Sequence, residues 1–221
     1  MTVTLDTIRD NPVVQNYMRI GNAYIGNIGA IEHNLNHAEK TAALCRKILT
    51  ALGFSEREAE LGAIAGYLHD IGNLVNRYGH GLSGALIAFN LLLDMGMDLE
   101  EIATIMGAIG NHEEHAQGSS VNHVAAALIL ADKSDVHRSR VRKTDIATFT
   151  QRDRVNYAVT DSQLVIEPEN KVISMVLEID TSVCSVIEYF EIFLTKMLMC
   201  RRAAEFLGCQ FELVINNHKL L

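Results

Sequence analysis

The chain of 221 residues has few of the features that mark disordered, secreted or membrane proteins. Only two residues are proline, and 48% are hydrophobic against 21% charged, so extended disorder is not expected. The N-terminus has acidic residues early and no signal-peptide layout, and no apolar run reaches the length of a membrane span. We therefore expect a soluble cytoplasmic protein with a sizeable core and no membrane partner.

Two further absences narrow the class of protein. The four cysteines form no C-x-x-C pair and sit among apolar neighbours, which indicates reduced core residues rather than a disulfide framework or a zinc cluster. Basic residues are fewer than acidic ones, and the net charge of -8 argues against a nucleic-acid partner. This charge does not exclude an anionic substrate, because a bound metal can reverse the local sign.

Hydrophobic periodicity divides the chain into a helical part and a mixed part. Apolar spacing, capping residues and turn residues predict helices over 12–28, 31–52, 55–68, 82–95, 98–109, 122–130 and 182–207, and strands over 157–166, 171–179 and 210–215. The fold class is therefore mainly α. We expect an all-helical body over residues 1–143, followed by a small α+β (β-β-α-β) appendage over residues 144–221.

The most informative stretch is Tyr67–Asn73, in which His69 and Asp70 stand side by side at the end of an apolar run. Two ionisable residues at such a place cost desolvation energy unless something pairs or coordinates them, and a divalent metal would bind both. The alternative is an ordinary helix end, in which the histidine contacts the last carbonyls and Gly72 stops the helix in a left-handed turn. The pair alone does not decide between these interpretations.

Further residues of metal-ligand type recur at or near helix ends: His37, His80, His112 and Asp132. Their order, with Leu68–Gly72, His80–Ala85, Asn111–Glu113 and Ala131–Asp135 around them, resembles the HD superfamily of metal-dependent phosphohydrolases over about residues 31–143. The resemblance implies an HD-type helical bundle and a minimal metal set of His37, His69, Asp70 and Asp132. In two-metal members a second pair of histidines is added, and His80 and His112 fit those positions, with Asp70 as the bridge.

The resemblance also implies an enzyme that cleaves a phosphoester or phosphoanhydride bond with metal-activated water. Mixed imidazole and carboxylate ligands favour iron or manganese, while zinc, nickel and magnesium remain open, and two ions are expected. Asp70 and Lys133 are the candidate catalytic residues. Lys133, or a member of the basic run Arg138–Lys143, would supply the cation that offsets charge on the phosphoryl group, although such a run is as often a solvated face.

The substrate implied by the resemblance is a small phosphorylated molecule such as a nucleotide. Asn111 and Asn73 stand where relatives that cleave cyclic dinucleotides have a histidine and a lysine, and the G-Y-P segment of those relatives is missing. The layout is nearer to relatives that hydrolyse nucleotides or dinucleoside polyphosphates. The competing hypothesis is a non-catalytic sensor or interaction protein that retains the metal site.

Several polar residues near these motifs keep two interpretations. His33 would approach the substrate or lie on a solvated helix face, and His115 would hold a ligand or a substrate oxygen. Glu113 and Glu114 would be general bases or solvated helix-end acids. The appendage from about Thr144 provides none of the ligands. We expect it to cover the substrate or to form a homo-oligomer, because a small sheet leaves an exposed edge.

Overall fold

The computed structural model describes residues 2–114 and 118–220. The predicted helical body is present, and its helices have the following bounds: α1, Leu5–Arg9; α2, Pro12–Asn27; α3, Leu35–Ala51; α4, Glu56–Leu68; α5, His80–Asp94; α6, Leu99–Gly110; and α7, His123–Ser134. Short 3₁₀ turns η1 (Ile71–Leu74), η2 (Arg138–Arg140) and η3 (Ile146–Thr148) connect some of them. No helix of the described residues is both long and apolar enough to cross a membrane.

The remaining residues form the small α+β region, which contains α8 (Gln151–Ala158), β1 (Val159–Glu167), β2 (Val172–Ile179), α9 (Val186–Phe206), β3 (Gln210–Ile215) and β4 (His218–Lys219). The sheet order is β1-β2-β3-β4. β1 and β2 form the expected antiparallel hairpin, whereas β2 and β3 are parallel and are connected through α9. The fold class is confirmed, and the protein as a whole is not all-α because of this sheet.

Local sequence explains most helix starts. The side chain of Asn11 caps the helix that begins at Pro12, and Ser55 and Glu58 form the expected capping box. Thr150 and Asp153 form another capping box, which starts α8. The predicted strand at Tyr157 was wrong for this reason: Tyr157 belongs to α8, and β1 begins only at Val159.

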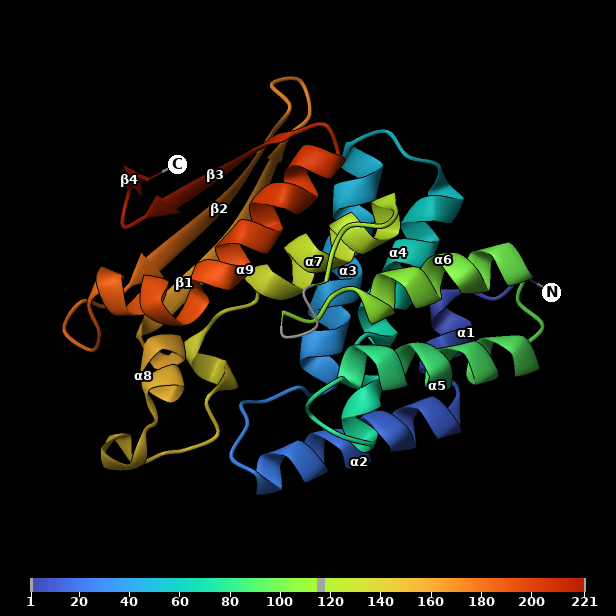
Figure 1. Cartoon of the computed structure of the whole chain (residues 1–221), viewed down its shortest axis with the longest axis horizontal. Helices are drawn as coiled ribbons and strands as arrows, with labels where there is room; N and C mark the ends of the chain where they lie inside the picture. Colours follow the sequence, from blue (N-terminus) through green and yellow to red (C-terminus); the bar gives the residue numbers. More distant parts are fainter. Residues whose placement is uncertain (1, 115–117, 221) are drawn as a thin grey trace.

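Helix α7 lies at the centre of the molecule (Figure 1). It packs against α3, α4 and α6 on one side and against α9 on the other, so all but one of its described residues from Val124 to Ser134 are buried. The largest side chains buried in α9 are Tyr189 and Phe193. The apolar core therefore continues from the helical body into the appendage. The division near residue 143 stays a prediction.

Candidate metal centre

The six predicted ligands come from separate helix ends that converge on one place. His37 lies in the first turn of α3, where the Asn34 side chain accepts a hydrogen bond from its backbone N–H. His69 and Asp70 follow α4, His80 is the first residue of α5, His112 follows α6, and Asp132 lies in the last turn of α7. All are buried except Asp132, which is nearly so. The structure thus brings together residues that are up to 95 positions apart in the sequence, from His37 to Asp132.

Four of these side chains place one donor atom each around a common point. His37 Nε2 lies 3.2 Å from His69 Nε2, 3.5 Å from Asp70 Oδ2 and 3.3 Å from Asp132 Oδ1. His69 Nε2 lies 3.1 Å from Asp70 Oδ2 and 3.6 Å from Asp132 Oδ1. Ligand atoms about 2.1 Å from a metal lie about 3.0 Å apart in an octahedron and about 3.4 Å apart in a tetrahedron. The spacing therefore suits one metal ion.

A second group of donor atoms shares Asp70 with the first. His80 Nε2 lies 3.0 Å from His112 Nε2 and 3.3 Å from Asp70 Oδ1, the carboxylate oxygen that the first group does not use. The side-chain amide of Asn73 donates to the same Oδ1 at 2.9 Å. Each oxygen of Asp70 therefore faces a different pair of histidines, which is the arrangement of a bridging carboxylate.

The histidine rings are fixed by their other nitrogen atoms. Nδ1 lies 2.7 Å from the Gly66 carbonyl in His69, 2.8 Å from the Arg77 carbonyl in His80 and 2.6 Å from the Ile109 carbonyl in His112. In His37 it lies 2.7 Å from the Asp135 carboxylate. Because these oxygens only accept, Nδ1 donates in each ring and the lone pair of the neutral imidazole is on Nε2. His69 therefore contacts a carbonyl of the last turn, as the helix-end interpretation expects, and its Nε2 is left for a metal ligand role, which stays a prediction.

The charges at this centre favour a bound cation. Asp70 Oδ2 is buried and accepts no hydrogen bond from any described residue. Burial opposes protonation of His69, but Asp70 and Asp132 outweigh it and raise the pKa of His69. Burial and the neighbouring His80 and His69 hold the pKa of His112 well below its usual range, so His112 is neutral. Facing lone pairs beside the buried carboxylate of Asp70 and the nearly buried one of Asp132 fit a metal ion, which would replace a proton on His69.

Gly72 contributes close packing rather than a left-handed turn. It lies in η1 and has no positive φ, so the turn expected in the helix-end interpretation is absent at this residue. A Cβ atom there would lie 2.0 Å from the His80 carbonyl oxygen and 2.5 Å from the Gly84 nitrogen. The start of α5, with His80, can therefore approach Asp70 only because residue 72 is glycine.

The acidic residues after His112 are not solvated. Glu113 is buried; its carboxylate accepts hydrogen bonds from the backbone N–H groups of Gly79 and Gly81 and lies 3.4 Å from His80 Nδ1. Burial opposes these contacts, which nevertheless lower the pKa of Glu113 to about 2. Glu113 thus anchors the N-terminus of α5. Glu114 instead lies 3.3 Å from Lys133 Nζ, which also donates to Asp132 Oδ2 at 2.7 Å.

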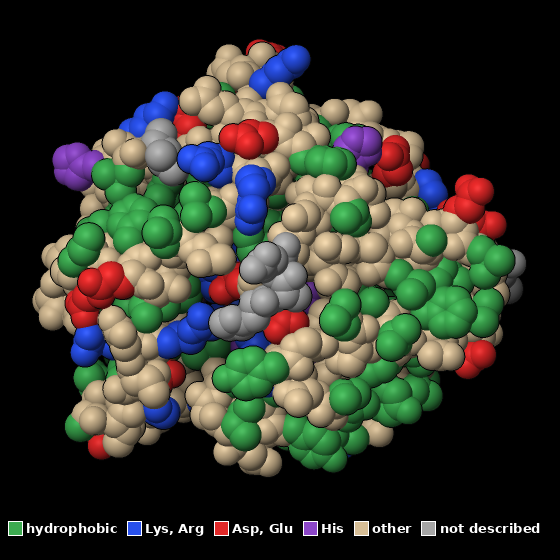
Figure 2. All heavy atoms as spheres, in the orientation of Figure 1, with side chains coloured by type: hydrophobic (Ala, Val, Ile, Leu, Met, Phe, Trp, Pro, Cys, Tyr) green, Lys and Arg blue, Asp and Glu red, His purple; other side chains and the backbone are tan. Residues whose placement is uncertain are grey.

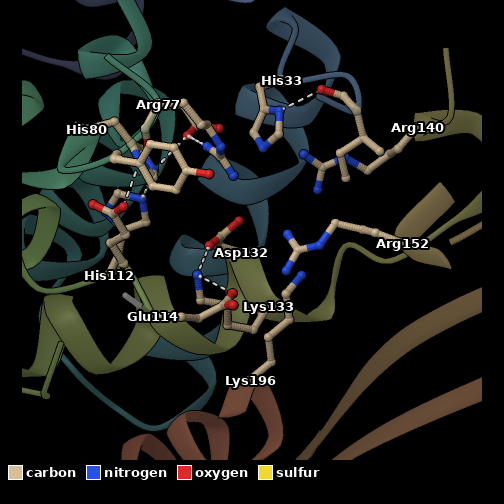
Figure 3. Close-up of a pocket in the computed structure, with 14 residues that line it drawn as sticks. His33, Arg77, His80, His112, Glu114, Asp132, Lys133, Arg140, Arg152 and Lys196 are labelled. Atoms are coloured by element: carbon tan, nitrogen blue, oxygen red, sulfur yellow. Dashed lines mark hydrogen bonds and ion pairs between the residues drawn. The ribbon is translucent and has the colours of Figure 1, made fainter. Parts of the chain in front are cut away.

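A cavity of about 340 Å³ opens beside the two groups of ligands. Its described lining includes five basic and four acidic side chains: Arg77, Lys133, Arg140, Arg152 and Lys196, and Asp70, Glu113, Glu114 and Asp132. Figure 3 shows the basic side chains directed into the space around Asp132. Figure 2, in the orientation of Figure 1, shows several Lys and Arg side chains close to the middle of the molecule and apolar side chains gathered over its lower right. With a metal bound, the cavity would be positive and suited to an anion.

The basic run contributes only one residue to this cavity. Arg140 is buried and donates to the backbone carbonyls of Glu32 and Asp135. Arg142 donates to the Ala30 carbonyl, and Lys143 pairs with Asp153 at 2.7 Å. Most of the run is therefore structural. Hydrophobic periodicity gave no signal for the other three basic residues that line the cavity. These are Arg77 in a loop, Arg152 in α8 and Lys196 in α9.

The two weaker histidine candidates have different outcomes. His33 precedes α3 instead of lying on it, is buried, and lines the cavity with Nδ1 2.8 Å from the Ile31 carbonyl. The solvated-face alternative was therefore wrong for His33. His115 lies outside the described residues.

Comparison with known proteins agrees with this geometry. The model of the HD domain family matches residues 34–139, which contain all six candidate ligands. An uncharacterized protein of Methanocaldococcus jannaschii is 26% identical over 159 residues, which are 62% of this chain and 61% of the relative. The chain thus spans less than two thirds of that relative's length. The family match, together with the clustered histidine and aspartate side chains on converging helix ends, identifies residues 34–139 as an HD domain.

Proposed function

We propose that this protein is a metal-dependent phosphohydrolase that cleaves a phosphoester or phosphoanhydride bond of a small phosphorylated molecule, such as a nucleotide. One observation carries the proposal: two groups of metal-ligand atoms share Asp70 and open on a cavity whose wall carries five basic side chains. A cavity of about 340 Å³ is at the small end of the range for small-molecule sites, which is about 300–1,000 Å³.

The residues present fit two divalent metal ions. His37, His69, Asp70 and Asp132 would hold one, and Asp70, His80 and His112 the other, with iron or manganese favoured by the mixed imidazole and carboxylate donors. When bound, the metals supply Lewis acidity, which polarises a phosphoryl oxygen and makes water a stronger acid.

Lys133 is the residue best placed to neutralise the phosphoryl group. Burial opposes its charge, but Asp132 and Glu114 raise its pKa, so the ammonium stays charged. An ammonium has three N–H donors, and these two carboxylates take two of them. The third is left for a phosphoryl oxygen in the cavity, where a donor already held in place stabilises the developing negative charge.

Arg77 extends this role to the other side of the centre. Its guanidinium donates to Asn73 Oδ1 at 3.2 Å and lies 3.8 Å from Asp70 Oδ1, so one contact orients it while other N–H groups face the cavity. We propose that Arg77 and Lys133 hold the reacting phosphoryl group from two directions. Asp70, which belongs to both groups of ligand atoms, would hold the two metal ions in position.

A panel of nucleotides and a chromogenic phosphoester, each assayed with several divalent metals, tests the proposal. We expect turnover that requires added metal and falls at least 100-fold in His112→Ala, while His218→Ala, an exposed histidine in β4, serves as the matched control and keeps full activity. Metal binding without turnover on any member of the panel would contradict the hydrolase proposal and favour the non-catalytic sensor.

A further inference from the structure

Two cations of the cavity wall come from the C-terminal region rather than from the HD domain. Arg152 belongs to α8 and Lys196 to α9, whereas the other described lining residues lie between Ile31 and Arg140. In Figure 3 both side chains point into the cavity from the side opposite His80 and His112. The metal ligands and this pair therefore face each other across the same space.

Both cations make cation–π contacts with the ring of Phe193. Lys196 Nζ lies 4.3 Å from the centroid of the Phe193 ring, and Arg152 Cζ lies 5.7 Å from it. Phe193 is fully buried in the core beneath α9, and Lys196 itself is only 8% exposed. Cation–π contact with a fixed ring limits the positions that the two charged groups can take. The pair is thus part of the built wall and not a mobile surface feature.

The pair has no carboxylate partner within the described chain. Neither cation lies within ion-pairing distance of a described carboxylate, and the nearby Glu114 is already paired with Lys133 at 3.3 Å. Burial is the main cause that lowers the pKa of Lys196 to about 8; Glu114 opposes it, while Lys133 and Arg152 lower it further. Two adjacent cations in a partly desolvated wall cost free energy that a bound anion would offset.

We propose that Arg152 and Lys196 form a second anion subsite, which binds a phosphate group of the substrate other than the one that reacts. The substrate class is then a small molecule with two phosphate groups or a diphosphate, rather than a simple monophosphate ester. The identity of the reacting group rests on the proposed function, but the subsite itself does not. In this arrangement the C-terminal region selects the substrate and the HD domain carries the reacting centre.

A purely structural role for Lys196 makes a different prediction. Methionine has nearly the same length and would keep the contact with Phe193 while removing the charge. If Lys196 only packs, Lys196→Met should bind anions as the native protein does. If it forms the subsite, anion binding should fall and Lys196→Arg should restore it.

Calorimetric titration with inorganic pyrophosphate tests the subsite without any need for turnover. The full-length protein is titrated in buffer that contains a metal chelator, so that metal ions do not contribute to pyrophosphate binding. We expect binding to weaken about 10-fold or more in Lys196→Met and in Arg152→Gln, the loss typical of one charge-assisted hydrogen bond. Arg201→Gln, an exposed arginine on the same helix, is the matched control and should bind as the native protein does. Arg152 is half-buried, which keeps its variant informative if Lys196→Met folds poorly.

The proposal is overturned if the native protein does not bind pyrophosphate, or if both variants bind it as tightly as Arg201→Gln does. A kinetic assay tests the same subsite by comparing kcat/KM for a bisphosphate with kcat/KM for a chromogenic monoester. The ratio of these two values should fall about 10-fold in Lys196→Met. Absence of all turnover with intact, Lys196-dependent pyrophosphate binding would refute the proposed function and leave the subsite. Turnover with an unchanged ratio and unchanged binding would refute the subsite alone.

Discussion

Asp135 offers the sharpest test of the proposed metal site around His37, because it contacts this candidate ligand without being a candidate ligand itself. Its Oδ2 accepts a hydrogen bond from His37 Nδ1 at 2.7 Å, whereas the other three ligand histidines donate to backbone carbonyls. Arg140 and Lys40 lie 3.6 and 3.8 Å from the same carboxylate. The carboxylate therefore fixes the ring of His37 and makes its Nε2 more basic.

We expect Asp135→Asn to weaken one metal site selectively. Loss of a partner of this kind costs about 10–100-fold in metal affinity, which is about 1.4–2.7 kcal/mol. Asp135→Asn should lose about 10-fold in metal affinity, because the amide oxygen can still accept a hydrogen bond from His37 Nδ1. Asp135→Ala should lose closer to 100-fold. The group of His80, His112 and Asp70 does not contact Asp135, so its affinity should change less than twofold.

Competition with a chromophoric chelator measures both affinities on the full-length protein, and circular dichroism verifies the fold. Asp145→Asn, an exposed aspartate that caps η3, is the matched control. The reasoning would be refuted if both sites weakened equally, or if Asp135→Asn retained the affinity of Asp145→Asn at both sites.

Three further outcomes follow from the same structure. Elemental analysis of the native protein should give one to two transition-metal ions per chain, and Asp70→Ala should lose both. His80→Ala and His112→Ala should each lose one ion, whereas the control His218→Ala should lose none. If His80→Ala and His112→Ala both retain two ions, the assignment of the second site is wrong. Lys196 is charged below its pKa of about 8, so the affinity for pyrophosphate should fall as pH rises through 8. The fall should be smaller in Lys196→Arg, and comparing the two proteins cancels the titration of pyrophosphate itself. If affinity falls equally with pH in both proteins, this prediction is wrong. Light scattering should give a mass above that of one chain of 24.4 kDa if the C-terminal region pairs two copies, a partner prediction that a monomer would overturn.

Local sequence determined the helical body and the residues that could bind metal. Capping residues such as Asn11 and Ser55 act within a few positions, and apolar spacing marks the buried face of each helix, so both can be recognised without the fold. The order of His37, His69, Asp70, His80, His112 and Asp132 resembled that of the HD superfamily, and the HD domain model matches residues 34–139, which contain all six. Their metal-binding roles stay predictions.

Only the tertiary structure decided what surrounds those residues. The orientation of His37 by Asp135 joins residues 98 positions apart, and the burial of Glu113 depends on the start of α5 packing against it. Arg152 and Lys196 look like ordinary charged residues in an appendage, and their places in the cavity wall depend on α9 packing against α7 and on α8 packing against α9. Helix periodicity is a local property, whereas the convergence of helix ends and the sharing of one cavity come from long-range packing, which no short window of sequence contains.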